Sequence, residues 1–294
     1  MKIRIRANPK AEHQYSTAQN LVAGFLAHGL SDVKIVPDIN APCDLAVIWG
    51  TRSLPNVRPK FAKDCLIMER SYFHDRYQDI SLGFNGLNGR ADFCLDSPTI
   101  TSERFERKYA NQLLPWNTQN QKEYTLITTQ CLNDQSLMIP FQNQTMNVFR
   151  EYQRIIREVK RYSPRPLAVK HHPLKPLCVH AAANKLFQGI QGIPHDMSIA
   201  KVFANAYAVV TINSNSGVEA LLAGVPVINT DVGAMSWNVA VKDKFSRLQN
   251  IRENLDEFDR HSWTVKLAYC QWSQDEIASG EAWNHLKWKY ENNR

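Results

Sequence analysis

The 294-residue sequence predicts an α/β protein with two Rossmann-like, doubly wound parallel-sheet domains that face a cleft. Two observations support this prediction. Short apolar runs alternate with helical patterns in both halves of the chain, which favours parallel sheets covered by helices. A polar cluster at residues 117–121 separates the halves and is typical of a linker. The length suits two domains, and 44% hydrophobic residues suffice for two cores.

The first domain is expected over residues 1–120. Apolar runs predict four strands, at residues 2–6, 33–36, 45–49 and 65–69. A helical pattern covers residues 16–27, and Gly29 follows it as a C-terminal stop. This alternation of strands and helices favours one parallel sheet.

The second domain is expected over residues 121–265. Its strands are predicted at residues 124–128, 167–170, 208–212 and 225–229, with an arginine-rich helix between the first two. The final segment, 266–294, contains Ser273-Gln274-Asp275-Glu276, a capping-box pattern. We therefore expect a helix from there to about residue 288 that returns across the first domain.

Composition limits the class of protein. The formal net charge of +7 is spread over both halves and suits a polyanionic partner. No apolar run approaches the ~18 residues needed to cross a membrane. Six cysteines are scattered without a CxxC pair, which indicates reduced thiols rather than disulfides or a zinc site. We expect a cytoplasmic protein without a membrane span or a bound metal.

Polar residues follow three predicted strands of the second domain. Because the carboxyl ends of parallel strands meet at one edge of a sheet, these residues are expected to form one ligand site. The loop at residues 214–217 begins a short helix, whose free N–H groups suit a phosphate. Each residue alone also fits a simple cap or turn. The candidate binding residues are Gln130, Asp134, Ser136, His172, Ser214, Asn215, Ser216, Gly217 and Glu219.

These motifs resemble the ordered motifs of the capsule-polysaccharide Kdo-transferase superfamily. The similar segments are Gln130-x-x-x-Asp134-x-Ser136, then His172-Pro173, then residues 216–227. The resemblance implies a GT-B fold, inversion at the anomeric carbon, and a nucleotide-sugar donor held by the C-terminal domain. It implies no cofactor besides this co-substrate.

In the first half, Glu69-Arg70-Ser71 and Ser81-Leu82-Gly83 are similar to the same superfamily's acidic strand end and Ser-x-Gly segment. Inverting transfer needs one base that deprotonates the acceptor hydroxyl. Glu69 is the first candidate base, Asp75 the second and Asp92 the third. A glutamate at a strand end is otherwise an arginine partner, and Arg70 or Arg76 lies nearby in sequence. The chain contains no DxD sequence, which would indicate a metal-dependent transferase.

The segment 81–93 is rich in glycine and asparagine and resembles phage-encoded proteins associated with DNA hypermodification. Such a loop lets the backbone approach a ligand, and an arginine in it suits a phosphate. Asn88 and Arg90 in this loop are therefore candidate acceptor-binding residues, and Arg70 is a further candidate. The alternative is a tight structural turn whose asparagines and glycines accept a positive φ.

The arginine-rich helix has one apolar face and one basic face. Arg150, Arg154, Arg157 and Arg161 recur at helical spacing. Arg154 and Arg157 are candidate contacts to a DNA backbone. The alternative is an ordinary solvated helix face.

These features predict an inverting, metal-independent glycosyltransferase that moves a sugar from a nucleotide-sugar to a hydroxyl. The acceptor predicted first is a hydroxymethylated pyrimidine in double-stranded phage DNA. The alternative is a saccharide or lipid acceptor of capsule polysaccharide synthesis. A second alternative is a sugar-nucleotide- or DNA-binding protein without catalytic activity.

Overall fold

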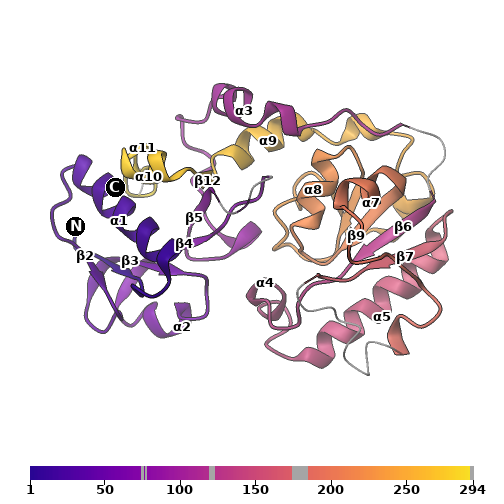
Figure 1. Cartoon of the computed structure of the whole chain (residues 1–294), viewed down its shortest axis with the longest axis horizontal. Helices are drawn as coiled ribbons and strands as arrows, with labels where there is room; N and C mark the ends of the chain where they lie inside the picture. The colour runs from indigo at the N-terminus through magenta and orange to yellow at the C-terminus, as the bar shows by residue number, and fades with distance from the viewer. Residues whose placement is uncertain (74–75, 77, 119–122, 174–184, 292–294) are drawn as a thin grey trace. The chain divides into compact units, whose positions relative to one another are not determined.

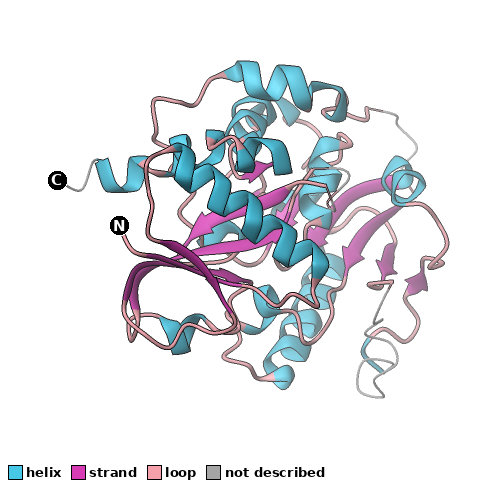
Figure 2. Ribbon diagram, turned by 60° about the vertical axis from the view of Figure 1, so that its left-hand side comes forward, coloured by secondary structure: helices cyan, strands magenta, loops and turns pink. Residues whose placement is uncertain are grey.

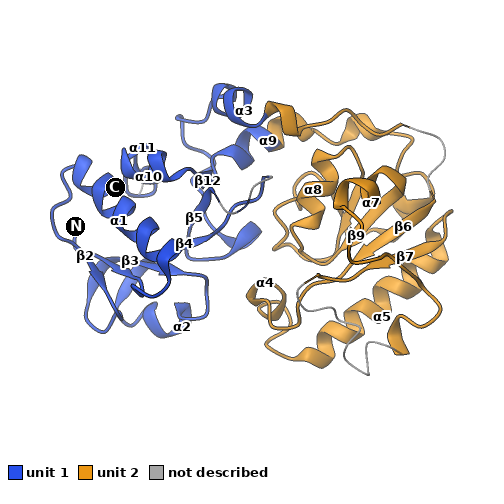
Figure 3. Ribbon diagram, in the orientation of Figure 1, with its two compact units in different colours: residues 1–109, 264–294 blue, residues 110–263 orange. Residues whose placement is uncertain are grey.

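The computed structural model describes residues 1–73, 76, 78–118, 123–173 and 185–291. The chain forms two compact units, coloured separately in Figure 3: unit 1 is Met1–Tyr109 with Thr264–Arg294, and unit 2 is Ala110–Trp263. The boundaries between the units lie at residues 109/110 and 263/264, whereas the sequence analysis expected them at 120/121 and 265/266. The backbone N–H of Leu114 donates to Leu222 O at 2.8 Å, and that of Asn117 to Gly224 O at 3.0 Å. Residues expected at the end of the first domain are therefore bound to unit 2.

Unit 1 contains a six-stranded mixed sheet in the order β12-β5-β4-β3-β1-β2. Strands β1 to β4 pair in parallel, whereas β5 is antiparallel to β4 and β12 is antiparallel to β5. The strands are β1 Ile3–Arg6, β2 Val33–Val36, β3 Cys43–Trp49, β4 Ala62–Arg70, β5 Ile80–Phe84 and β12 Gln271–Trp272. The four predicted strands are thus confirmed, and the two antiparallel strands were missed.

Helices cover this sheet, as Figure 1 and Figure 2 show. They are α1 Glu12–Ala27, α2 Leu54–Val57, the 3₁₀ turn η1 Asn88–Arg90, α3 Ser102–Lys108, α10 Gln274–Ala278, α11 Glu281–Leu286 and α12 Trp288–Glu291, while α9 Arg260–Ala268 crosses the boundary between the units. Helix α1 begins four residues before the predicted start. Its polar first turn did not show the apolar spacing on which the prediction depended.

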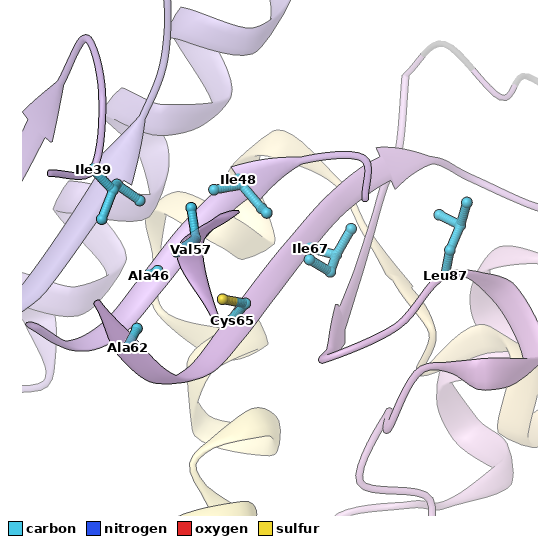
Figure 4. Close-up of a cluster of buried hydrophobic side chains, with 8 residues drawn as sticks. All are labelled: Ile39, Ala46, Ile48, Val57, Ala62, Cys65, Ile67 and Leu87. Atoms are coloured by element: carbon cyan, nitrogen blue, oxygen red, sulfur yellow. The ribbon is translucent and has the colours of Figure 1, made fainter. Parts of the chain in front are cut away.

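The alternation of side chains along β4 builds a core on each face of the sheet. Leu66 faces Leu21 and Phe25 of α1, together with residues of α10 and α11. Its neighbours Cys65 and Ile67 belong to a separate cluster, drawn in Figure 4. That cluster consists of Ile39, Ala46, Ile48, Val57, Ala62, Cys65, Ile67 and Leu87. Both faces of β4 are therefore buried, as expected for a strand inside an α/β sheet.

The C-terminal segment packs on unit 1, but the expected single helix is wrong. The segment forms three short helices, and the break between α10 and α11 occurs where Gly280 adopts a left-handed φ of 86°. A Cβ at this position would lie 2.8 Å from the ring of His28. Both the left-handed φ and this close contact therefore favour glycine. The expected capping box is present: Ser273 and Glu276 each accept the other's backbone N–H.

Buried charges fasten this segment to α3. Arg104 donates two hydrogen bonds to the carboxylate of Glu276, and Lys108 donates a third at 2.9 Å. Arg104 also donates to the carbonyl oxygens of Ala268 and Gln271, at 2.9 Å each. Burial opposes the ionisation of Glu276, but the two cations outweigh it and lower its pKa to about 2.

Unit 2 contains an entirely parallel sheet in the order β11-β10-β9-β6-β7-β8. The strands are β6 Tyr124–Thr128, β7 Leu167–Lys170, β8 Gln191–Gly192, β9 Ala206–Thr211, β10 Val227–Asn229 and β11 Val241–Lys242. The main helices are α4 Gln135–Met138, α5 Thr145–Tyr162, α7 Ile199–Asn205 and α8 Ser216–Leu222. Counted from β6, the order from β8 to β11 is 3-2-1-4-5-6, that of a Rossmann fold.

Candidate functional site

The first site lies where the strand order of unit 2 reverses. Successive strands are added on one side of β6 as far as β8, and the chain then returns to place β9 on the other side. Such a switch point leaves room for a ligand outside the carboxyl ends of the strands. Gln130 follows β6 and Asn213 follows β9, so both belong to this edge.

Gln130 and Asn213 join these two strand ends. The Nε2 of Gln130 donates to Oδ1 of Asn213 at 2.9 Å, and the backbone N–H of Asn213 donates to Oε1 of Gln130 at 3.3 Å. Both residues are buried. The backbone N–H of Gln130 also donates to the hydroxyl of Tyr152 on α5. Gln130 therefore supports the site, and its amide is engaged with protein groups.

The loop after β6 is attached to the same pair. Asp134 caps α4, because its Oδ1 accepts the backbone N–H of Ser136 at 2.9 Å and its hydroxyl at 2.8 Å. The Nδ2 of Asn213 donates to the carbonyl oxygen of Ser136 at 2.7 Å. The structure thus brings together Gln130, Asp134 and Ser136.

Asn213 and Asp231 were not among the predicted site residues. Asp231 follows β10, and its Oδ2 accepts Nδ2 of Asn213 at 2.7 Å and the backbone N–H of Gly233 at 3.2 Å. Asn213 thereby connects the loops after β6, β9 and β10. The same rule that selected Gln130, a polar residue directly after an apolar strand, would have selected both.

His172 lies at the end of β7, beside the β6 loop. Its Nδ1 is 3.2 Å from Sγ of Cys131. The adjacent His171 has a structural role: it contacts Thr129 at 3.1 Å and packs edge-on against Phe187. Burial, assisted by the charge of His195, lowers the pKa of His171 to about 4 and keeps it neutral. Of the two histidines, His172 is the better candidate for a ligand contact.

The loop before α8 is anchored to β6 and to its own helix. The hydroxyls of Ser216 and Thr128 are 2.6 Å apart, and the Oγ of Ser214 accepts the backbone N–H of Ser216. Asn215 donates to Oε1 of Glu219 at 3.1 Å. The helix α8 has only seven residues, so the contribution of its dipole is small.

Gly217 has a reason for being glycine other than the close approach of a ligand. It is buried, and a Cβ there would lie 2.8 Å from Oγ of Ser236 and 3.3 Å from Oδ1 of Asn229. The missing side chain lets α8 pack against the last residues of β9 and β10 and against Ser236. This packing fixes the position of the neighbouring Ser216 and Glu219.

In unit 1, Glu69 lies next to the end of β4. Its Oε1 accepts the backbone N–H of Arg70 at 2.8 Å. A Cβ at Gly50 would lie 3.7 Å from Oε2 of Glu69, which places this oxygen beside the end of β3. Arg76, considered as its partner, donates its Nε to the carbonyl oxygen of Ser71 at 2.7 Å. Asp75 lies outside the described residues.

An aromatic and two basic side chains surround this strand end. The guanidinium of Arg70 is 5.8 Å from the ring centre of Trp49, and the ring of His13 packs edge-on at 5.0 Å. Burial and then the charge of Arg70 lower the pKa of His13. Trp49 and His13 were not predicted; Trp49 is the last residue of β3, so the strand-end rule points to it.

The segment 81–93 has the backbone of a tight turn. Asn85 and Asn88 have φ values of 59° and 52°. A Cβ at Gly83 would lie 2.6 Å from the ring of Phe93, and one at Gly86 would lie 2.2 Å from the carbonyl oxygen of Arg90. These contacts account for Gly83 and Gly86 by packing, and the positive φ values account for Asn85 and Asn88. Asn88 and Arg90 are partly exposed in η1.

Asp92, the third candidate base, is held in an ion pair. Its Oδ2 accepts a hydrogen bond from Lys289 at 2.8 Å, and Oδ1 accepts the backbone N–H of Cys94 at 2.9 Å. Burial opposes ionisation, but these two donors outweigh it and lower the pKa of Asp92. The arrangement ties α12 to this segment and favours a structural role.

The basic face of α5 is partly neutralised. Arg154 forms ion pairs with Glu151 at 2.6 Å and with Asp243 at 2.7 Å, and hydrogen bonding to Glu151 raises its pKa. Arg157 pairs with Glu158 at 3.0 Å, although its side chain is 68% exposed. Arg154 is therefore a weak candidate for contacting a phosphate, and Arg157 a better one.

The family follows from the region that contains the first site. A family model described as capsule polysaccharide biosynthesis protein matches residues 88–239, which is more than half of the chain. The chain belongs to this family. The predicted resemblance to capsule-synthesis transferases is confirmed, and the match spans Gln130, His172, Asn213 and Glu219.

Solved structures show the fold. The β-Kdo 2,7 transferase of Thermosulfurimonas dismutans KpsC is similar with a TM-score of 0.57 at 15% identity, over 96% of this chain and 99% of that chain. The β-Kdo 2,4 transferase of the same organism's KpsC is similar with a TM-score of 0.56 at 14% identity, over 92% and 90%. The predicted α/β fold of GT-B type is confirmed. No curated protein matches the chain.

Within the described residues, no helix is long and apolar enough to cross a membrane. The predicted glycosyltransferase activity agrees with the family and with the fold. Neither comparison points to DNA or to a phage.

Proposed function

We propose that this member of the capsule polysaccharide biosynthesis family is an inverting glycosyltransferase that transfers a sugar from a nucleotide-sugar to a saccharide acceptor. The observation that supports it best is the hydrogen-bonded pair Gln130–Asn213 at the switch point of the unit 2 sheet. This pair organises three loops at the edge where Rossmann-like sheets bind nucleotides.

In this proposal unit 2 binds the donor. His172, which follows β7, and Glu219, in the helix that follows β9, provide an imidazole and a carboxylate on either side of β6, suited to a phosphate and to sugar hydroxyls. Ser214 and Ser216 add hydroxyls at the same edge. These side chains form hydrogen bonds to the leaving nucleotide, whose negative charge grows as the glycosidic bond to its phosphate breaks. No bound metal is part of the proposal.

Unit 1 supplies the base. Glu69 accepts the proton of the acceptor hydroxyl while the oxygen of that hydroxyl attacks the anomeric carbon and the nucleotide departs. The backbone N–H of Arg70 holds Oε1 of Glu69, which orients the carboxylate. Trp49 offers an apolar ring of the kind on which sugar rings stack, and Arg70 provides a cation beside it.

A saccharide acceptor is favoured over DNA for two reasons. The family is one of capsule polysaccharide biosynthesis. The arginine face of α5 is also less available than its sequence suggested, since Arg154 is bound between Glu151 and Asp243. Transfer to hydroxymethylated DNA remains the competing outcome of the test.

The test is a transfer assay with a panel of nucleotide-sugars that includes an activated Kdo. The acceptors are short saccharides with and without a terminal Kdo, and a duplex containing hydroxymethylated pyrimidines. We expect transfer to a saccharide, inversion at the anomeric carbon, and loss of transfer in Glu69→Gln. Transfer to the duplex alone would replace the saccharide acceptor by DNA. Donor binding without transfer to any acceptor would favour a non-catalytic binding protein.

A further inference from the structure

Gln271 links the C-terminal segment to the backbone that follows the candidate base. Its Oε1 accepts the backbone N–H of Tyr72 at 2.7 Å and that of Phe73 at 3.2 Å. These two residues come directly after Glu69-Arg70-Ser71 at the end of β4. Gln271 is 1% exposed, and Tyr72 and Phe73 are also buried. A single amide oxygen, nearly 200 residues away in sequence, thus satisfies two adjacent backbone donors.

The nitrogen of the same amide binds the residue at which the chain enters β5. The Nε2 of Gln271 donates to Oδ2 of Asp79 at 3.3 Å, and the hydroxyl of Tyr109 donates to the same oxygen at 2.5 Å. Asp79 directly precedes β5. Gln271 itself is fixed by pairing with Ser81 in the sheet and by the guanidinium of Arg104 at its carbonyl oxygen.

Tyr72 extends this connection to Asn88, another candidate acceptor-binding residue. Its hydroxyl accepts a hydrogen bond from Ser81 at 3.0 Å and donates to Oδ1 of Asn88 at 3.3 Å. Ser81 is paired with Glu69 across β4 and β5. Glu69 and Asn88 are therefore connected through the segment that Gln271 holds.

We infer that Gln271 is a positioning residue for Glu69 and Arg70. Its amide fixes the backbone immediately after them, and so sets the direction in which the two side chains leave the strand end. Because the parts of a transfer site must be aligned closely, a shift of about 1 Å at the base lowers the rate by ~10²-fold. The inference rests on the proposed function, since it assumes that Glu69 is the base.

Gln274 provides a matched control in the same segment. Its Nε2 donates to Oγ1 of Thr17 at 3.0 Å, and its Oε1 accepts Nδ2 of Asn20 at 2.8 Å. It therefore ties the C-terminal segment to α1 as Gln271 ties it to β4. Gln271→Ala and Gln274→Ala both remove an amide that fastens this segment, but only the first frees the backbone after Glu69.

The experiment compares these two variants with the wild-type protein in two measurements. The first is hydrogen exchange of the Tyr72 and Phe73 amides, which requires no activity. We expect exchange to be at least ~10-fold faster in Gln271→Ala and unchanged in Gln274→Ala. The second is transfer kinetics, where we expect kcat to fall by ~10²-fold in Gln271→Ala. Nucleotide-sugar affinity should remain that of the wild type, because the donor residues lie in unit 2.

A charge-balanced rescue separates positioning from general loss of stability. Gln271→Glu keeps an oxygen for the two backbone donors but loses the donor to Asp79. Asp79→Asn in the same chain restores a donor across this pair. We expect the double variant to recover most of the lost kcat and the slow exchange. Gln271→Ala is predicted to do neither, even at a temperature where it is fully folded.

The outcomes distinguish this inference from the proposed function. Unchanged exchange at Tyr72 and Phe73 in Gln271→Ala would overturn the inference whether or not the protein transfers sugar. An equal loss of kcat in Gln271→Ala and Gln274→Ala would overturn it too, because the effect would then be general to the segment. A wild-type protein that binds no nucleotide-sugar would refute the proposed function, while the exchange measurement would still decide whether Gln271 holds this backbone.

Discussion

Gln130 and Asn213 follow the adjacent strands β6 and β9 of the unit 2 sheet, and each donates a hydrogen bond to the other. They are 83 residues apart in sequence and both buried. Asn213 also donates to Ser136 O and to the carboxylate of Asp231. The polar edge of this sheet is therefore a single network, in which each loop depends on the others.

Asn213→Asp tests this network with almost no change of shape. The new carboxylate would replace the donor that now faces Ser136 O and Asp231, so like charges and acceptors would meet in a buried place. We expect unit 2 to be destabilised by ~3–5 kcal/mol and nucleotide-sugar affinity to fall at least ~10-fold. Urea denaturation and calorimetric titration measure the two effects. The exposed Asn254→Asp is the control; equal behaviour of the two variants would contradict the network.

Glu69→Gln tests the base. The amide keeps the size of the carboxylate and its acceptor oxygen but accepts no proton. We expect transfer to fall by ~10²–10⁴-fold while donor affinity is unchanged. Initial rates at saturating donor give the comparison, with Asp92→Asn as the control that removes an ion-paired carboxylate. If Glu69→Gln transfers normally and Asp75→Asn is inactive, the base is Asp75.

Removal of divalent metal tests the proposed phosphate contacts. In our proposal protein side chains alone stabilise the leaving nucleotide, so transfer should proceed at an undiminished rate in excess EDTA. The assay is run on protein dialysed against chelator, with and without added Mg²⁺ or Mn²⁺. A rate that collapses on chelation and returns with one metal would show that a cation shares this role.

His285 makes unit 1 sensitive to acid. Its two ring nitrogens contact Thr99 at 2.7 Å and Phe93 O at 2.8 Å, and burial lowers its pKa to about 4. A depressed histidine pKa means that the unfolded chain binds the proton first, near pH 6.5. The contribution of neutral His285 to the free energy of unfolding is therefore complete above pH 6.5. It is lost as the pH falls towards 4, by up to ~3 kcal/mol.

Denaturation of the wild-type protein and of His285→Gln between pH 8 and pH 4 measures this contribution. We expect the variant to be less stable at pH 8 but to lose less stability on acidification. Parallel pH profiles for the two proteins would assign the acid sensitivity to other groups, such as His171 in unit 2.

The sequence by itself determined the α/β class, the four parallel strands of unit 1, four of the six strands of unit 2 and the residues at their ends. These features are local: apolar runs set the strands, and parallel strands place their polar carboxyl ends at one edge. The motifs around Gln130, His172 and Glu219 also indicated the family.

Only the tertiary structure decided how those residues are used. Asn213 became the centre of the site, Gly217 a packing position and Arg154 an ion-paired residue, because each has partners from elsewhere in the chain. The strands β5 and β12 and the break at Gly280 were missed for the same reason. Two-residue β12 has no periodicity to detect, and it exists because Gln271 and Trp272 pair with β5. Contacts between distant segments leave no local pattern, so they become visible only when the chain is folded.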